Sequence, residues 1–307
     1  MNKILITPRS YGKTDMSVID QLKAAGFEPV MNPYGQILTK EQMIKEIGDC
    51  VGVILGVDPM DKDVIDAAPH LKAIAKYGVG TDNIDLKYAE EKGIKVSITR
   101  AANANAVADM AFALICACAR KITFINDQCH EKDWTKVMGL DIYGKKIGIL
   151  GLGAIGKGVA KRAKGFDMDV YAYDVFWNEE FAKANDIKFA EPAEIFKECD
   201  FISLHLPLTD ETNKIVNTES IATMKPNAIL VNTARGGLID DDALLTALAE
   251  KKIAAAGLDV FNEEPPADER VYKLDNIIMG SHAAASTNGA SETMSRMATE
   301  NVIRDAK

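Results

Sequence analysis

An arginine, a glutamate and a histidine follow one another in the last third of the chain. Arg235 lies in VNTARGG, Glu264 in DVFNEEPP and His282 in GSHAAAS. A guanidinium can bind a carboxylate through two parallel hydrogen bonds. An imidazole can exchange a proton near neutral pH, and a carboxylate beside it can hold its tautomer. Together these three groups could bind a 2-oxo or 2-hydroxy acid and carry a proton to or from its oxygen.

A glycine-rich motif precedes these residues and could supply the other half of a redox reaction. GLGAIG follows the apolar stretch IGIL and opens a basic helical stretch, KGVAKRAK. Gly151 allows a tight turn, Gly153 lets a pyrophosphate approach the backbone, and Gly156 allows the helix to pack closely. The amides of Ala154 and Ile155 would point at the phosphates from the helix N-terminus. The motif therefore predicts a dinucleotide that exchanges hydride with the acid.

An aspartate after the next strand indicates which dinucleotide binds. Asp174 ends VYAYD, where a carboxylate can bond the ribose 2′ hydroxyl and repel a 2′-phosphate. Its successors Val175, Phe176 and Trp177 include no arginine that could receive such a phosphate. We therefore expect NAD. The alternative is a glycine turn and a surface aspartate without a ligand.

Each member of the trio also has an ordinary structural interpretation. Arg235 could form a salt bridge, Glu264 could be solvated in its acidic loop, and His282 could be a packed polar residue at a strand end. A second histidine, His205, ends FISLHL. Its neighbour Pro207 fits a wall of the cofactor site better than proton transfer.

The elements that must position these residues alternate between short apolar strands and amphipathic helices, which predicts parallel sheets. Only the second half of the chain carries the glycine motif. We expect an α/β protein in which a Rossmann-type NAD-binding domain, residues 99–285, is inserted in a flavodoxin-like substrate domain, residues 1–98 plus 286–307. The strand ends of two facing domains would form the cleft for a small molecule. A long helix is expected at about 105–121.

Composition excludes several other classes of protein. The 307 residues carry a net charge of −9, which argues against nucleic acid as a partner. No run of 18 apolar residues and no signal peptide is found, so we expect no membrane partner. The five cysteines show neither disulfide nor metal-ligand spacing. We therefore expect reduced thiols, a cytoplasmic location and no metal.

Ordered motifs along nearly the whole chain give it a family resemblance. They are GVGTDNID, ANAVAD, GKKIGILGLGAIG, SLHLPLTDET, MKPNAILVNTARGGLIDDDAL, AAGLDVFNEEP and SHAAAST. The chain resembles the D-isomer-specific 2-hydroxyacid dehydrogenases, and within them it is most similar to the phosphoglycerate dehydrogenases. We expect a short form without a regulatory domain.

The resemblance implies roles for many residues. Arg235 would bind and polarise the oxo acid, His282 would be the acid/base, Glu264 would pair with it, and Asp259 would hold the nicotinamide carboxamide. Further cofactor contacts would be Val79, Val107, His205, Leu206, Pro207, Thr212, Thr233, Ala234 and Ala284. The substrate carboxylate would bind the loop of Lys76, Tyr77, Gly78, Val79 and Gly80.

The chain departs from the phosphoglycerate group at one point, where Lys76-Tyr77 replaces a frequent Arg-Ala. Lysine can still serve a phosphate, though as a point charge. Arg9 is a further candidate for an anionic substrate tail, and is equally well explained as a surface arginine.

The resemblance implies oxidation of 3-phosphoglycerate to 3-phosphohydroxypyruvate, a step of serine biosynthesis. The alternatives are another small 2-oxo acid (glyoxylate, hydroxypyruvate, pyruvate or a branched-chain acid) and, more remotely, an NAD-sensing, corepressor-like interaction protein. We also expect a homodimer formed through residues 105–121 and the following QCHEKDW segment.

Overall fold

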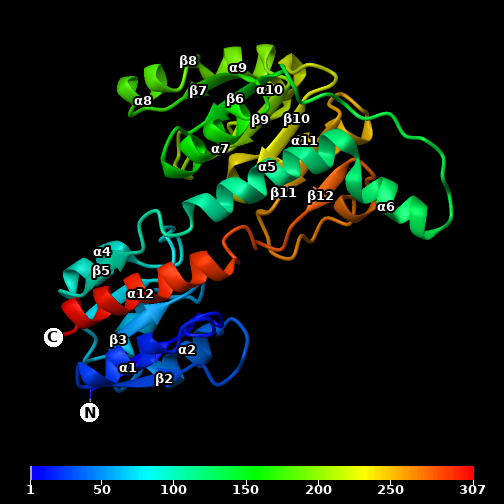
Figure 1. The fold of residues 1–307 in the computed structure, drawn as a ribbon. Helices are drawn as coiled ribbons and strands as arrows, with labels where there is room; N and C mark the ends of the chain where they lie inside the picture. The colour runs from blue at the N-terminus through cyan, green and yellow to red at the C-terminus, as the bar shows by residue number, and fades with distance from the viewer. Residues whose placement is uncertain (1) are drawn as a thin grey trace. The chain divides into compact units, whose positions relative to one another are not determined.

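The structure, a computed structural model, describes residues 2–307 and divides into two compact units (Figure 1). The first unit runs to Asn103 and resumes with Ser286–Lys307, while the second is Ala104–Ala285. The chain therefore crosses between units at 103–104 and at 285–286, whereas the sequence placed the first crossing at 98–99. Thr99 stays with the first unit because its backbone N–H donates to the carbonyl of Gly78 at 3.0 Å.

The first unit is built on a five-stranded parallel sheet in the order β2-β1-β3-β4-β5. This is the flavodoxin-like order, as expected. Its strands are β1 (Asn2–Ile6), β2 (Phe27–Met31), β3 (Cys50–Leu55), β4 (Ala73–Lys76) and β5 (Lys95–Ile98). Its helices are α1 (Ser17–Ala24), α2 (Lys40–Ile47), α3 (Lys62–Asp66), α4 (Leu86–Glu91) and α12 (Asn288–Asp305).

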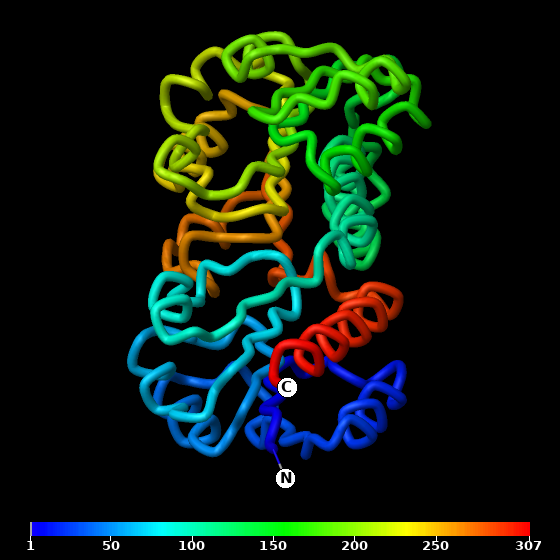
Figure 2. Tube along the Cα trace, turned by 90° about the vertical axis from the view of Figure 1, so that its left-hand side faces the viewer, coloured from blue at the N-terminus to red at the C-terminus, as the bar shows by residue number. Residues whose placement is uncertain are grey.

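Both faces of this sheet are covered, so its strands are almost wholly apolar. Leu5, Val53 and Ile74 pack with α2 and α3 on one face. Ile4 and Ile54 point to the other face, where buried residues of α1 and α12 meet them. The last helix thus completes the core of the N-terminal segment and lies beside α1 (Figures 1 and 2).

The second unit contains a seven-stranded parallel sheet in the order β12-β11-β10-β9-β6-β7-β8. The order reverses between β6 and β9, which is the Rossmann arrangement and confirms the expected fold. The strands are β6 (Lys146–Leu150), β7 (Asp169–Tyr173), β8 (Ile187–Phe189), β9 (Phe201–Leu204), β10 (Ile229–Asn232), β11 (Ala255–Leu258) and β12 (Ile277–Met279). The helices are α5 (Ala104–Arg120), α6 (Ile122–His130), α7 (Ala154–Lys164), α8 (Glu179–Ala184), α9 (Pro192–Glu198), α10 (Thr218–Thr223) and α11 (Asp241–Ala249), with short 3-10 turns at Gly236–Leu238 and Val271–Lys273.

Two layers of helices cover this sheet as well. On one face, α5 and α7 pack on Ile147, Ile149 and their neighbours. On the other face, α9, α10 and α11 pack on Leu150, Ile202 and Leu230. Because all seven strands are parallel, their carboxyl ends share one edge, and the loops after β6, β9, β10, β11 and β12 meet there. No helix among residues 2–307 is both long and apolar enough to span a membrane.

Candidate active site

The glycine motif forms the turn between β6 and α7, at the point where the strand order reverses. Gly151 has φ +103°, and a Cβ there would lie 2.6 Å from the carbonyl of His205 after β9. A Cβ on Gly156 would lie 2.0 Å from the carbonyl of Gly151. A Cβ on Gly153, by contrast, would meet nothing within 4 Å. Two glycines therefore serve close packing, while Gly153 faces the open space that a pyrophosphate needs. Ala154 and Ile155 form the first turn of α7.

Asp174 directly follows β7, beside the glycine turn. Its Oδ2 accepts the N–H of Leu152 at 2.7 Å, and its Oδ1 accepts the N–H of Phe176 at 2.9 Å. Each carboxylate oxygen retains a further lone pair for a ribose hydroxyl. Val175 and Phe176 are exposed beyond it. The carboxylate thus fixes the turn through two backbone amides and places negative charge beside the glycine motif.

The loop after β9 forms the next part of this edge. Burial lowers the pKa of His205 to about 3, so its ring is neutral near physiological pH. Its Nε2 lies 2.8 Å from the hydroxyl of Ser203. Leu206 is buried and Pro207 is exposed, and the Thr212 hydroxyl closes the loop by donating to the Pro207 carbonyl at 2.6 Å. A neutral, buried imidazole agrees with a wall of the cofactor site rather than with proton transfer.

Two buried polar atoms on this edge test whether the residues fit a dinucleotide. Among residues 2–307, five buried side-chain polar atoms lack a hydrogen-bond partner, and two of them, His205 Nδ1 and Thr233 Oγ1, lie on this edge. Such atoms are costly unless a ligand or water satisfies them. They follow β9 and β10, next to the glycine turn after β6. Together with the open Gly153, they fit a polar cofactor lying along the strand ends.

Arg235 lies in a fastened turn after β10. The side chain of Asn232 donates to the Arg235 carbonyl at 2.8 Å and accepts the N–H of Ala234 at 3.0 Å. Arg235 Nη1 donates to the Ala234 carbonyl at 2.7 Å. A Cβ on Gly236 would lie 2.1 Å from the backbone of Phe261. This glycine therefore lets the turn pack directly on the loop after β11, which carries Glu264.

Glu264 and His282 form the hydrogen-bonded pair that the sequence predicts. His282 Nδ1 lies 2.9 Å from Glu264 Oε2 and 3.2 Å from Oε1, and both side chains are about 40% exposed (43% and 38%). The N–H of Phe261 donates to Glu264 Oε1 at 3.1 Å and helps to hold the carboxylate. Because an ionised carboxylate only accepts hydrogen bonds, Nδ1 carries the proton and Nε2 is left to exchange one with a ligand.

His282 adopts a left-handed backbone conformation, with φ +56°. Few non-glycine residues take this conformation, although histidine does so more often than most. Here the N–H of His282 donates to the Asp259 carbonyl at 2.8 Å. The buried Asp259 carboxylate accepts the N–H of Ala283 at 3.0 Å and that of Ala284 at 2.7 Å. Asp259 therefore holds the turn that carries His282 through these hydrogen bonds. This role is separate from the cofactor contact that the family resemblance implies.

The remaining predicted residues belong to other parts of the chain. Arg9 and residues 76–80 belong to the first unit, and Val107 lies at the start of α5 in the second unit. Arg9 and Val79 are exposed, Gly78 has φ +138°, and Tyr77 and Gly80 are partly buried. Lys76 is only 5% exposed. Its ammonium donates to Asn83 Oδ1 at 2.8 Å and to the carbonyl of Gly56. Lys76 therefore fastens its own loop, and the roles of this group toward substrate stay predictions.

The sequence analysis missed two features of this edge, the role of Asn232 and the second role of Asp259. Asn232 was not singled out, although a buried asparagine ending the apolar run AILVN is a signal that its side chain has partners nearby. The grip of Asp259 on the His282 turn has no sequence signal, since it depends on the loops after β11 and β12 meeting in space.

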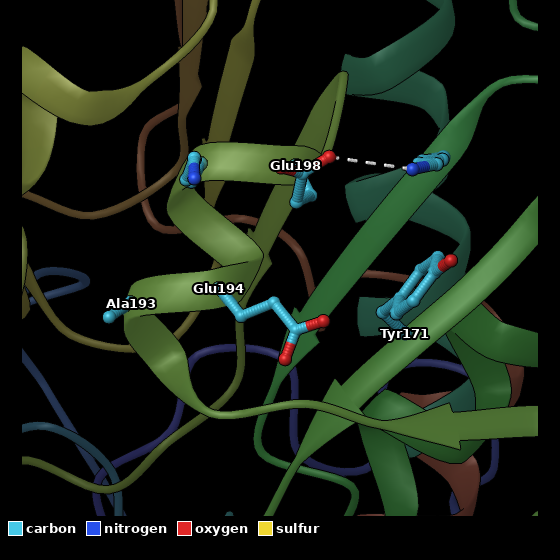
Figure 3. Close-up of a pocket in the computed structure, with 6 residues that line it drawn as sticks. Tyr171, Ala193, Glu194 and Glu198 are labelled. Carbon is cyan, nitrogen blue, oxygen red and sulfur yellow. Dashed lines mark ion pairs between the residues drawn. The ribbon is translucent and has the colours of Figure 1, made fainter.

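A surface hollow of about 480 Å³ lies elsewhere in the second unit (Figure 3). It is lined by Lys146, Tyr171, Ala193, Glu194, Lys197 and Glu198, and an ion pair of 3.6 Å joins Lys146 to Glu198. None of the predicted site residues lines it. Residues 2–307 also contain no group of three or more His, Cys, Asp or Glu side chains that could hold a metal ion.

Comparison with known proteins identifies the second unit. Residues 112–284 match the NAD-binding domain of the D-isomer specific 2-hydroxyacid dehydrogenases. This match covers the glycine turn, Arg235, Glu264 and His282.

Relatives that match most of this chain are named for different substrates. A glyoxylate reductase of Korarchaeum cryptofilum is 41% identical over 86% of this chain and 82% of its own length. A hydroxypyruvate reductase of Thermotoga maritima is 42% identical over 87% of this chain and 89% of its own. A D-3-phosphoglycerate dehydrogenase of Methanocaldococcus jannaschii is 43% identical over 86% of this chain. The match spans only 51% of that last protein.

A solved structure agrees with these relatives. The D-lactate dehydrogenase of Aquifex aeolicus, in complex with NAD and lactic acid, superposes with a TM-score of 0.85. It is 29% identical and covers 97% of this chain and 94% of its own. A protein of the same fold therefore holds NAD and a 2-hydroxy acid together.

The position of Asp174 generates a prediction on cofactor choice. The protein should bind NADH more tightly than NADPH. Asp174→Asn should reduce the ratio of the NADPH to the NADH dissociation constant about tenfold, because it removes the charge that repels the 2′-phosphate. Fluorescence titration with both cofactors measures the ratio. Asp169→Asn, at the opposite end of β7, is the matched control and should leave it unchanged. Equal affinity for both cofactors in the parent protein would contradict the role of Asp174.

Proposed function

The chain belongs to the D-isomer specific 2-hydroxyacid dehydrogenases, and we propose that within this family it reduces short 2-oxo acids of the glyoxylate or hydroxypyruvate type with NADH. The coarser activity, NAD-dependent interconversion of a D-2-hydroxy acid and its 2-oxo acid, follows from the family match and the relatives. The finer choice is supported by relatives that are named for these two substrates and are covered over most of their length.

The surroundings of Lys76 also support an uncharged substrate tail. Of the two cations considered for a phosphate, Lys76 is buried and directed at Gly56 and Asn83 within its own unit. Using it for a phosphate would break these bonds. Arg9 is exposed, but a phosphate with about two negative charges ordinarily takes several cationic or N–H donors. 3-Phosphohydroxypyruvate, the product of 3-phosphoglycerate oxidation, is the second candidate, favoured by the 43% identity to a phosphoglycerate dehydrogenase.

The hydrogen-bonded pair carries the proposed mechanism. The glycine turn, Asp174 and the edge of β9 and β10 would hold NADH, which when bound would supply the hydride to the carbonyl carbon. His282 Nε2 gives its proton to the carbonyl oxygen while the C=O π bond breaks. Glu264 holds Nδ1–H and stabilises the imidazolium before the transfer. In oxidation neutral His282 takes the hydroxyl proton instead.

Arg235 completes the reacting group. Its guanidinium is suited to bind the substrate carboxylate through two bonds and to polarise the adjacent carbonyl. The fastened turn of Asn232 and Gly236 reduces the freedom of its backbone, which favours one orientation of the acid. We also expect the loop of residues 76–80 in the first unit to offer backbone amides to a substrate carboxylate.

We propose a homodimer as the assembly. α5 buries ten residues, and it packs on β10, β11 and β12 of its own sheet. The adjoining α6 buries none and stands off the rest of the second unit with the segment that follows it (Figure 1). Trp134 and Met138 in that segment are 81% and 85% exposed. Exposed apolar residues of this kind suit a self-complementary two-fold interface.

The free cysteines support a cytoplasmic location. All five are unpaired thiols, and Cys50, Cys118 and Cys199 are buried. Unpaired thiols are typical of proteins in a reducing compartment.

The substrate choice is tested by steady-state kinetics with NADH on glyoxylate, hydroxypyruvate, pyruvate, a branched 2-oxo acid and 3-phosphohydroxypyruvate. We expect kcat/KM to be at least about tenfold higher for glyoxylate or hydroxypyruvate than for the phosphorylated acid, since desolvating an unpaired phosphate is costly. A preference for the phosphorylated acid that Arg9→Ala or Lys76→Ala abolishes would establish the second candidate instead.

The proton role of His282 gives a further prediction. His282→Ala should lower kcat by ~10²–10⁴, the usual contribution of a positioned acid/base, while the affinity for NADH changes little. His70→Ala, at an exposed histidine of the first unit, is the control and should keep full activity. Unimpaired turnover by the His282 variant would refute the assignment.

The dimer prediction is checked by light scattering at micromolar concentration. The parent protein should have the mass of two chains. Trp134→Glu with Met138→Glu should shift it toward one chain, because each glutamate would bury a charge in the interface. Phe176→Glu introduces the same charge at another exposed aromatic position, where the side chain is 88% exposed, and should not dissociate the dimer. A parent mass of one chain would defeat the proposal.

A further inference from the structure

The loop of residues 76–80 is hydrogen-bonded to both segments through which the chain passes between its units. One segment is residues 99–103, before the first crossing, and the other is 286–291, after the second. We propose that Thr99 and Tyr77 are positioning residues that couple substrate occupancy of this loop to the two crossing segments. The inference rests on the proposed function, because it takes the 2-oxo acid carboxylate as the ligand of the loop.

Thr99 forms the link to the first crossing. Its hydroxyl accepts the N–H of Gly78 at 2.9 Å and lies 3.2 Å from the Gly78 carbonyl, to which the Thr99 N–H also donates at 3.0 Å. Thr99 is fully buried. Two residues later, Ala101 has a left-handed backbone with φ +60°. The loop glycine is thus bonded to the start of a segment that holds an unfavourable conformation for alanine.

Tyr77 forms the link to the second crossing. Its hydroxyl lies 3.0 Å from the carbonyl of Ser291, to which it donates, and it accepts from Ser10 Oγ at 3.3 Å. Ser291 lies in the first turn of α12, and its own hydroxyl donates to the Ser10 carbonyl at 3.1 Å. Ser295 Oγ is 3.2 Å from the same tyrosine hydroxyl. A cluster of serines from both ends of the chain therefore surrounds one hydroxyl of the loop.

The base of the loop is rigid up to Tyr77, so Gly78 is the joint through which a ligand can act on both links. The Tyr77 N–H donates to the Leu55 carbonyl at 2.8 Å, which continues the pairing of β4 with β3. Lys76 is bonded to Gly56 and Asn83. Gly78, with φ +138°, is the point where the backbone can turn freely. A carboxylate bound to the amides after Tyr77 would fix the Gly78 joint and thereby stiffen both the bonds of Gly78 to Thr99 and those of the adjacent Tyr77 to Ser291.

These contacts also give a role to the position where the chain departs from the phosphoglycerate group. An alanine at position 77 would have no hydroxyl to form these bonds. The Lys76 ammonium donates to Gly56 and Asn83 at the base of the loop. The pair Lys76-Tyr77 accordingly anchors the loop instead of reading a phosphate.

The first test separates binding from chemistry. Tyr77→Phe removes only the hydroxyl, and Thr99→Val removes the hydroxyl at nearly constant volume. Each should raise KM for the 2-oxo acid about 3- to 10-fold, the range of one lost hydrogen bond, with KM for NADH unchanged. Thr99→Ser should restore the parent value. Tyr88→Phe, which loses a 2.6 Å bond to Asp66 in the same unit, is the control and should behave as the parent. Unchanged KM in both variants would overturn the proposal.

The second test measures the coupling itself by hydrogen exchange of the NADH complex with and without oxamate, an unreactive analogue of a 2-oxo acid. In the parent, oxamate should slow exchange in residues 76–80, 99–103 and 286–291 together. In Tyr77→Phe the slowing at 286–291 should be lost while that at 99–103 persists, and Thr99→Val should show the reverse. Slowing confined to the loop, or identical in parent and variants, would overturn the coupling.

The two failures can be told apart. If the parent turns over no 2-oxo acid and ignores oxamate, the proposed function fails. The links are then judged in the ligand-free protein, where Thr99→Val should speed exchange of the Gly78 amide and Tyr77→Phe should speed exchange of the first turn of α12. Unchanged exchange at both places would reject the links as well.

Discussion

Backbone packed directly on backbone at glycine positions holds the site edge of the second unit together. A Cβ on Gly151, Gly156 or Gly236 would overlap a neighbouring main chain at 2.0–2.6 Å, and one on Gly280 would meet the Asp259 carboxylate at 2.1 Å. Parallel strands bring their carboxyl ends to one edge, but only to within about 5 Å of the next strand. Because glycine has no side chain, the backbones of neighbouring loops come into direct contact at these positions. The side chains on either side of each contact are then oriented by packing.

Asp259 shows what this close packing makes possible. Its carboxylate is buried, which is tolerated because two amides of the next loop donate to it. The same bonds hold His282 in a left-handed conformation that an isolated histidine avoids. His282 is thus oriented twice, through its backbone by Asp259 and through its ring by Glu264. A proton donor with so little freedom needs less reorganisation before it transfers its proton.

The sequence predicts the elements that are strongly patterned and misses those that are not. The glycine turn, the strands β6, β9, β10 and β11 and the helix α5 are evident because apolar runs and turn residues bound them. β2 (Phe27–Met31) is not evident from the sequence because Glu28 and Pro29 interrupt it, which an edge strand tolerates. The short edge strand β8 (Ile187–Phe189) is not evident either, since its single lysine leaves only two apolar residues. In the site, residue types were predictable at strand ends, whereas partners from distant loops were not.

Lys76 illustrates that limit and its consequence for specificity. A lysine next to a glycine loop is predicted to face an anion, since sequence alone does not show where its stem leads. In the structure the ammonium turns inward to Gly56 and Asn83, and so joins the loop after β3 to the loop after β4. Charge that is already bonded cannot discriminate strongly between a phosphorylated and a plain substrate, because recruiting it would break as many bonds as it forms. Under the proposed function, selectivity for the acid's tail falls to groups other than Lys76, such as the exposed Arg9.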